Sequence, residues 1–252
     1  MTTPHDQLVQ RQFGSNAADY VSSPVHATGA DLAALAALAA AARPARALDL
    51  GAGGGHVAYA LAPHAGAVTA ADLSPAMLGE VRAEAARRGL GNIETVATAA
   101  ESLPFASGHF DFLASRFSAH HWRSAPAGLA EARRVLRAGG AAVFVDVIAP
   151  EAPAADSHLQ TIELLRDASH GRDYRQSEWA AMLAAAGFTA RRMTHGRLRM
   201  DFGPWTARMR TPAPMCAAIR AVQASASTEV AAHFAIEADG SFTLDTLMIE
   251  AD

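Results

Sequence analysis

The feature that most constrains the fold of this chain is a glycine-rich segment that follows a short apolar run. Residues 47–56 read ALDLGAGGGH, and the helix-like sequence VAYALA follows at 57–62. Glycine turns with positive φ, or lets backbone approach a ligand closely, without a steric penalty. The start of the following helix offers unpaired N–H groups and a positive dipole end to an anionic group. The segment therefore predicts a strand, a tight turn and a helix, with a cofactor seated at the turn.

Two glycine patterns fit this turn, and they point to different cofactors. The dinucleotide fingerprint G-x-G-x-x-G/A fails from Gly51, because His56 occupies its third position. Read two residues later, the same fingerprint is satisfied by Gly53, Gly55 and Ala58. The pattern D-x-G-x-G-x-G fits without any shift, at Asp49, Gly51, Gly53 and Gly55. The turn alone leaves both alternatives open.

Composition and charge narrow the class of protein. At 252 residues, half of them hydrophobic, the chain suits one α/β domain with an appended lid. A net charge of −4 argues against a general nucleic-acid binder, and the run from Arg191 to Arg199 is the one local basic exception. The single cysteine, the absence of a signal-peptide pattern, and an apolar run at 30–42 too short for a membrane span predict a soluble cytoplasmic protein.

Strand-like and helical patterns alternate along the chain. Strands are predicted at 47–50, 67–71, 94–97, 110–115, 141–148, 189–193 and 241–250. Ser74 caps one predicted helix with Pro75 in its first turn, and Gly187 ends another over 176–186. A helix over 125–137 precedes a turn at Gly139-Gly140, residues 169–174 read as a polar turn, and residues 198–202 either continue the sixth strand or stand apart. This alternation predicts a parallel, doubly wound sheet.

Asp72 ends the second predicted strand, after the glycine turn. A carboxylate at this position accepts hydrogen bonds from both vicinal hydroxyls of a ribose. The structural alternative is an acid near the helix start that competes with Ser74 as the cap. We favour the ribose role, which suits any adenosine cofactor and does not discriminate between the two glycine patterns.

Several motifs, taken in order, resemble those of class I S-adenosylmethionine-dependent methyltransferases, in the branch similar to ubiquinone and menaquinone biosynthesis methyltransferases. The D-x-G-x-G-x-G turn is followed by Asp72, by the A-E-x-L-P-F run at 100–105, and by an R-x-G-G turn at 137–140 before the fifth strand. The resemblance covers about residues 10–190. Many members carry Asp where Ala99 stands here, which leaves adenine selection to backbone groups, Glu101 and packing.

The resemblance implies a Rossmann-like, mostly parallel seven-stranded sheet with an antiparallel last strand and a helical lid. It implies one methyltransferase domain over 1–252, made of a lid (1–45), a cofactor-binding half (46–150) and a substrate-side half (151–252) with a helical insertion at about 203–232. S-adenosylmethionine is the expected cofactor. The expected cofactor-binding residues are Asp49, Gly51, Ala52, Gly53, Gly55, Asp72, Leu73, Met77, Ala100, Glu101, Arg116 and Tyr20.

The chemistry of methyl transfer from a sulfonium depends on positioning more than on proton transfer. Asp49 is expected to approach the ammonium group of the donor, or to pin the glycine turn through backbone N–H groups, or both. If the acceptor needs a base, His120 and His121 lie in the loop after the fourth strand, and His121 is favoured. His170 with Arg172 and Tyr174 forms a second polar group. A metal site at the three histidines lacks any supporting H-x-x-x-H or Cys pair, so none is predicted.

The favoured function is methyl transfer to a small molecule, with an aromatic or quinone-like ring suggested by the resemblance. One alternative is an NAD-dependent oxidoreductase that uses the register from Gly53, although no Tyr-x-x-x-Lys pair accompanies it. The other is a catalytically silent, cofactor-binding regulator, which Ala99 and the lack of an assured base keep open. The acceptor and the oligomeric state are not specified by the sequence.

Overall fold

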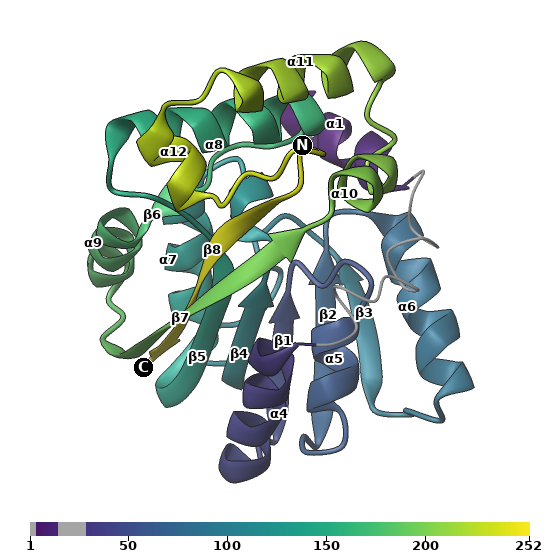
Figure 1. The fold of residues 1–252 in the computed structure, drawn as a ribbon. Coiled ribbons are helices and arrows are strands. Elements are labelled where there is room, and N and C mark those ends of the chain that lie inside the picture. The colour runs from purple at the N-terminus through teal and green to yellow at the C-terminus, as the bar shows by residue number, and fades with distance from the viewer. Residues whose placement is uncertain (1–3, 15–28) are drawn as a thin grey trace.

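The carboxyl ends of the parallel strands lie along one edge of a single sheet, at the top in Figure 1, and this edge carries the site. The computed structural model describes residues 4–14 and 29–252. The sheet has eight strands, seven of them in the order β3-β2-β1-β4-β5-β8-β7, with β6 paired to β5. The strands are β1 (Arg46–Leu50), β2 (Ala67–Asp72), β3 (Ile93–Ala97), β4 (Phe110–Arg116), β5 (Leu136–Ala149), β6 (Tyr174–Arg175), β7 (Ala190–Met200) and β8 (Phe242–Ala251).

Helices cover both faces of the sheet, as a doubly wound fold requires. The helices are α1 (Pro4–Gly14), α4 (Ala30–Ala42), α5 (His56–Leu61), α6 (Pro75–Arg87), α7 (Ala125–Val135), α8 (Pro153–Arg166), α9 (Gln176–Ala186), α10 (Phe202–Arg208), α11 (Ala213–Ala224) and α12 (Thr228–His233), with a 3₁₀ turn, η1 (Ala119–His121). α4 and α5 pack on one face through residues such as Leu35 and Leu61, and α7 and α9 on the other through Leu129 and Trp179. α8, α10, α11 and α12 form a third cluster above the carboxyl edge (Figure 1).

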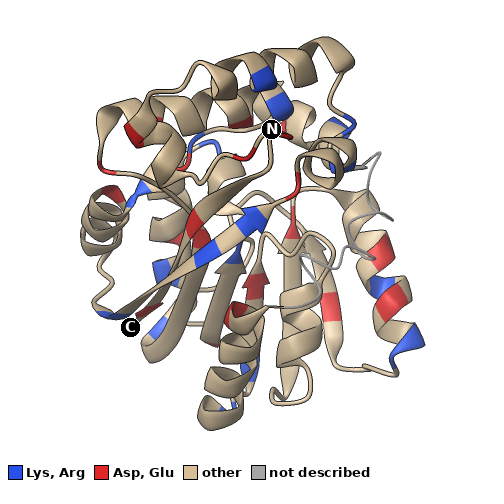
Figure 2. Cartoon of the chain, viewed as in Figure 1, with Lys and Arg blue, Asp and Glu red and all other residues tan. Residues whose placement is uncertain are grey.

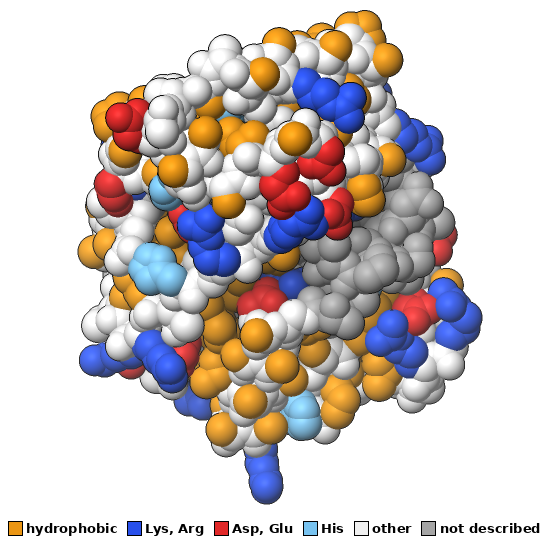
Figure 3. Space-filling model, in the orientation of Figure 1, with side chains coloured by type: hydrophobic (Ala, Val, Ile, Leu, Met, Phe, Trp, Pro, Cys, Tyr) orange, Lys and Arg blue, Asp and Glu red, His pale blue; other side chains and the backbone are white. Residues whose placement is uncertain are grey.

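The mostly parallel sheet with an antiparallel last strand is confirmed. β8 pairs antiparallel with both β5 and β7. All the other pairs of neighbouring strands in the sheet are parallel. Of the two alternatives for residues 198–202, the first holds: they continue the sixth predicted strand as far as Met200, so β7 is one continuous strand. Two arginines of β7 form ion pairs with acidic residues: Arg197 with Asp245 of β8, and Arg199 with Glu237, which lies between α12 and β8. Acidic and basic side chains consequently lie next to one another on this face (Figures 2 and 3).

Two local predictions were wrong. The expected turn at Gly139-Gly140 lies inside β5, which starts at Leu136 because Leu136 pairs with Phe110 of β4. The register of β4 and β5 shifts after this pair, and Gly139 has a positive φ of 71°. The polar turn at 169–174 ends in the short strand β6, which pairs with β5 at Ile148 and makes the count eight rather than seven. A strand of two residues leaves too little alternation to be recognised from sequence.

The segment expected to form a lid is described in part. α1 lies across the carboxyl edge, where Gln10 donates to the Leu73 carbonyl at 2.9 Å and Gln12 donates to the Met209 carbonyl at 3.0 Å. α4 packs instead against the sheet through Leu35. Tyr20 lies outside the described residues. Within residues 4–14 and 29–252, none of the helices combines the length and the apolar character that crossing a membrane demands.

Candidate functional site

The glycine turn after β1 is tied to the end of β2. The backbone N–H groups of Gly51 and Ala52 both donate to the Ala71 carbonyl, at 2.8 and 2.9 Å. Gly51 has φ of 74°, and a Cβ there would lie 1.8 Å from Oγ of Ser118 in the loop after β4. Gly51 is therefore required both by its left-handed conformation and by the close approach of the two loops.

Asp49 is buried beneath this turn. Its Oδ2 accepts a hydrogen bond of 2.9 Å from the N–H of Ala58, in the first turn of α5, so this carboxylate ties β1 to the helix that follows the glycine turn. Burial raises the pKa of Asp49 to about 7, against the lowering effect of the Ala58 N–H. The carboxyl also lines the cleft, where a cationic group would favour its charged form. A phosphate at the same place would be repelled.

Asp72 ends β2 with both carboxylate oxygens directed at backbone. Oδ2 accepts from Gly53 N–H at 2.8 Å and Oδ1 accepts from Ser74 N–H at 2.8 Å, so the acid links the glycine turn to the start of α6. Ser74 keeps its predicted cap, since its hydroxyl accepts from Met77 N–H at 3.3 Å. Burial raises the pKa of Asp72. Each carboxylate oxygen retains a lone pair, so a ribose diol can bind beside the backbone donors.

The cleft bounded by these acids takes in about 1000 Å³, its open mouth included. This size suits a nucleoside-type cofactor. Among the predicted cofactor-binding residues, those that line it are Asp49, Gly51, Ala52, Gly53, Asp72, Leu73, Met77, Ala100, Glu101 and Arg116. Gly55 does not line it: this residue caps α5 with φ of 81°, and a Cβ there would lie 2.7 Å from the hydroxyl oxygen of Tyr59. The lack of a side chain at Gly55 therefore permits close packing against Tyr59.

Two of the lining side chains have structural partners as well. Glu101 accepts a hydrogen bond of 2.9 Å from Ser124 N–H, which fixes the start of α7. Arg116 pairs with Asp31 of α4 and lies over the Phe117 ring, with its guanidinium carbon 4.6 Å from the ring centroid. α1 contributes three further lining residues that sequence reasoning did not assign to the site: Asp6, Val9 and Phe13. Their local signal is weak, because an amphipathic helix packs equally well on any apolar surface.

The two adjacent histidines after β4 have opposite ionisation. His120 Nδ1 lies 2.6 Å from Oδ1 of Asp146 in β5. Burial lowers the pKa of His120, but the Asp146 carboxylate outweighs that effect, and the pKa rises to about 9. Burial holds the pKa of His121 well below 6.5, and the positive charge of His120 lowers it further. His121 is therefore neutral at pH 7, whereas His120 is an imidazolium.

The two rings lie close together, with centroids 4.2 Å apart, and both line the second cavity described below. His121 Nδ1 lies 3.2 Å from the Ser169 carbonyl. Because a carbonyl only accepts, Nδ1 carries the proton, and Nε2 is the nitrogen that can take another. His170, from the predicted second polar group, lies with its centroid 5.8 Å from that of His120.

A second cavity of about 570 Å³ adjoins the cleft. Phe13, Phe117 and His121 line both spaces and so form their common wall. Its other apolar lining residues are Val147, Leu198, Met200, Trp205 and Leu244. Its other polar lining residues are His120, Glu163, Arg166, Asp173 and Arg208.

The residues of the cleft fit one class of cofactor. Asp49 and Asp72 are buried acceptors at the ends of adjacent parallel strands, which suits a ligand that offers an ammonium group and a ribose diol. Leu73 and Met77 provide the apolar wall that an adenine ring needs. The fold and the cleft thus define a Rossmann-like enzyme whose cofactor is S-adenosylmethionine.

Comparison with known proteins agrees with this assignment. Residues 48–144 match the family described as methyltransferase domain. The chain is 33% identical over 201 residues to the uncharacterized methyltransferase YcgJ of Bacillus subtilis (80% of this chain, 79% of YcgJ). The crystal structure of YcgJ superposes with a TM-score of 0.84, covering 88% of this chain and 97% of that one at 31% identity. The chain belongs to the S-adenosylmethionine-dependent methyltransferases.

Two further relatives extend the comparison. The uncharacterized protein YafE of Escherichia coli is 44% identical over 197 residues, which span 78% of this chain and 95% of YafE. The ubiquinone/menaquinone biosynthesis C-methyltransferase UbiE of Brucella anthropi is 30% identical over 198 residues, 68% of this chain and 73% of UbiE. The predicted family and cofactor are confirmed, and the NAD alternative is not supported.

Proposed function

We propose that this methyltransferase acts on a small molecule with an aromatic or quinone-like ring, bound in the second cavity. The observation that carries the proposal is the common wall: Phe13, Phe117 and His121 border both the cofactor cleft and the second cavity. An acceptor in the second cavity would therefore meet the cofactor across this wall. The apolar residues that line the cavity suit a ring. The name of the relative UbiE points to the same class of acceptor.

Bound S-adenosylmethionine would supply an electrophilic methyl group on a sulfonium. The chain's own contribution is to hold both partners in line, which accounts for roughly 7 to 11 kcal/mol of barrier lowering in well-oriented reactions. In this proposal Asp72 holds the ribose and Asp49 holds the ammonium group. Phe13 of α1 covers the region between the two spaces and keeps water away from it.

His121 is the residue proposed to take a proton from the acceptor. Its ring is neutral at pH 7, because burial and the nearby positive charge of His120 lower its pKa. Its Nδ1–H is engaged by the Ser169 carbonyl, which leaves Nε2 as the basic atom. His120 would then face the acceptor as a cation held by Asp146, and so favour a negative charge that develops on the acceptor.

The test is transfer of labelled methyl from S-adenosylmethionine to a panel of hydroxylated quinones, phenols, small carboxylates and amines. We expect turnover only with ring-bearing hydroxyl compounds. His121→Gln should lower kcat by about 10² to 10⁴ while leaving cofactor affinity unchanged, because general-base catalysis contributes that factor. The control is His195→Gln, an exposed residue of β7. Turnover with amines alone, or full activity of His121→Gln, would refute the respective part of the proposal.

A further inference from the structure

Three titratable side chains lie together at the edge of the second cavity, and two of them, His120 and Asp173, line it. His120 of η1, Asp146 of β5 and Asp173 of the loop before β6 come from three separate segments. One nitrogen or oxygen atom from each lies within 4.8 Å of the others. The side chains of Asp146 and Asp173 are only 3% and 2% exposed, so the carboxylates are shielded from bulk water.

His120 is held in the manner of a metal-binding histidine. Its Nδ1 pairs with Asp146, whose carboxylate is itself fixed by the N–H groups of Ala119 and Val147, each at 2.9 Å. Its Nε2 has no hydrogen-bond partner within the described part of the chain, and the ring lines the cavity. A carboxylate that orients one ring nitrogen while the other faces a cation is a recurrent arrangement in metal sites.

Asp173 brings an unsatisfied oxygen to the same place. Its Oδ2 is buried with no hydrogen-bond partner among the described residues, and the nearest cationic candidate, Nε2 of His170, lies 3.8 Å away. A buried oxygen in this state has lost its hydration without gaining a hydrogen bond, which is unfavourable. The fold therefore places a buried carboxyl oxygen near His120 without a hydrogen-bond partner among the described residues.

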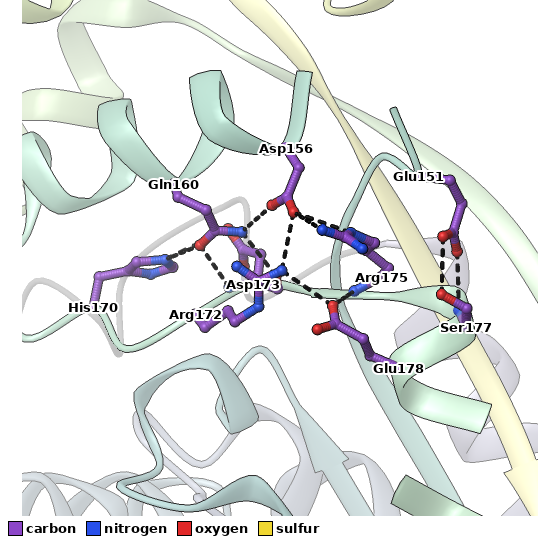
Figure 4. Close-up of polar contacts among 9 residues, drawn as sticks. All are labelled: Glu151, Asp156, Gln160, His170, Arg172, Asp173, Arg175, Ser177 and Glu178. Atoms are coloured by element: carbon purple, nitrogen blue, oxygen red, sulfur yellow. Dashed lines mark hydrogen bonds and ion pairs between the residues drawn. The ribbon is translucent and has the colours of Figure 1, made fainter. Parts of the chain in front are cut away.

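Hydrogen bonds to its backbone, not to its carboxylate, hold Asp173 in place. Gln160 of α8 donates to the Asp173 carbonyl at 2.8 Å and accepts from its N–H at 3.1 Å (Figure 4). The same Gln160 amide donates to Asp156, which also binds Arg172 and Arg175. This network anchors the loop to α8, so the unpartnered carboxylate is held in place and not free to turn to solvent.

The donor atoms indicate which kind of ion this place would take. His120 offers an imidazole nitrogen and Asp173 a carboxylate oxygen, whereas the nearby Glu163 carboxylate is already paired with Arg166 at 3.1 Å. A mixed nitrogen and oxygen set suits first-row divalent ions better than Mg²⁺ or Ca²⁺, which prefer oxygen ligands only.

We propose that Nε2 of His120 and the carboxylate of Asp173 bind a first-row divalent transition-metal ion in the second cavity, with Asp146 orienting His120 through Nδ1. The ion would replace the Nε2 proton of His120 and so supply the positive charge at that place. Two protein ligands leave coordination positions open toward the cavity. The inference rests on the proposed function in one respect: the open positions would bind an oxygen of the acceptor and orient its ring.

The test uses Co²⁺ as the probe and the full chain, stripped of metal by dialysis against a chelator. We expect one equivalent of Co²⁺ to bind and to produce visible d–d absorption bands. Asp173→Asn and His120→Gln should each weaken binding at least tenfold, while His195→Gln on the exposed face of β7 should bind as the wild type does. Asp173→Asn preserves both backbone hydrogen bonds to Gln160, so the loop should keep its place.

A second measurement needs no variant. Mn²⁺ added to the wild-type protein should broaden the imidazole NMR signals of His120 and His121 and leave those of the exposed His64 and His195 sharp. No binding, or equal Co²⁺ affinity in all three variants, would overturn the inference. Calorimetry with S-adenosylhomocysteine on the same samples separates the two proposals: cofactor binding and acceptor turnover without metal binding would reject the metal site and leave the methyltransferase function intact.

Discussion

Replacing Asp72 by Asn should reduce the affinity for S-adenosylmethionine by a factor that the contacts of this carboxylate allow to be worked out. The Asp72 oxygens accept from Gly53 and Ser74, and the ribose diol is expected to add its hydroxyl donors to the same oxygens. Asn replaces one oxygen by an NH₂ group and removes the charge. Loss of one charge-assisted hydrogen bond, about 1.5–3 kcal/mol, corresponds to a dissociation constant that is about 10- to 150-fold higher.

Asp111 provides a matched control for the structural part of this effect. Its carboxylate also accepts two backbone N–H bonds, from Ala45 at 2.9 Å and Arg46 at 3.0 Å, but it lies at the start of β4 and lines neither cavity. Asp111→Asn should lower the free energy of unfolding by about 1–3 kcal/mol and leave cofactor affinity within twofold.

The assay is calorimetric titration of wild type, Asp72→Asn and Asp111→Asn with S-adenosylmethionine, S-adenosylhomocysteine and NAD, alongside urea unfolding. We expect both sulfur cofactors to bind the wild type and NAD not to bind. Retention of wild-type affinity by Asp72→Asn would refute the ribose role and reduce Asp72 to a strut between the glycine turn and α6.

Three further predictions follow from the geometry. Gly51→Ala should lower the free energy of unfolding by about 2 kcal/mol or more, because the added Cβ would both clash with Ser118 and strain the backbone. Gly89→Ala, with φ of 69° and open space around it, should lower it by only about 1 kcal/mol. Urea unfolding measures both, and equal losses would refute the close approach at Gly51. Affinity for S-adenosylmethionine should rise as pH increases from 5.5 to 7, since the Asp49 carboxylate forms with a pKa of about 7, and calorimetry should find this slope missing in Asp49→Asn. The raised His120 pKa of about 9 should stabilise the fold by on the order of 3 kcal/mol below pH 6.5. That contribution should disappear as pH rises through about 9, and unfolding of Asp146→Asn should show little of this pH dependence if the ion pair causes it.

The elements that sequence predicts well are those with a local signature. The glycine turn, the Ser74 cap with Pro75 after it, and the Gly187 C-cap are each specified by a few adjacent residues, and each appears where expected. Most predicted strands lie close to their observed bounds, whereas β5 and β7 are longer than predicted. Because parallel strands present their carboxyl ends at one edge, Asp49 and Asp72, which lie at the ends of neighbouring strands, line one cleft.

The partners of His120 required the tertiary structure. Asp146 lies in the apolar run AVFVDVIA, and its proximity to His120 depends on β4 and β5 pairing with Arg116 opposite Val145. An acid inside an otherwise apolar strand is itself a signal, since a buried carboxylate needs a partner. Asp173 carried no such signal, because a loop acid is ordinarily solvated. The shared wall also depends on where α1 docks, which an amphipathic pattern does not specify.

The contrast between His120 and His121 shows why residue type and position in sequence are insufficient to assign a base. The two rings are neighbours in the chain, both are buried, and burial pushes the pKa of each downward. Only His120 has a carboxylate at hydrogen-bond distance, and that one contact reverses the direction of its shift. The cation so formed lies 4.2 Å from the other ring, between centroids, and helps to keep His121 neutral. Burial is the main reason that His121 stays neutral, and Asp146, a residue on a different strand that does not line the cofactor cleft, adds to the effect by keeping His120 charged.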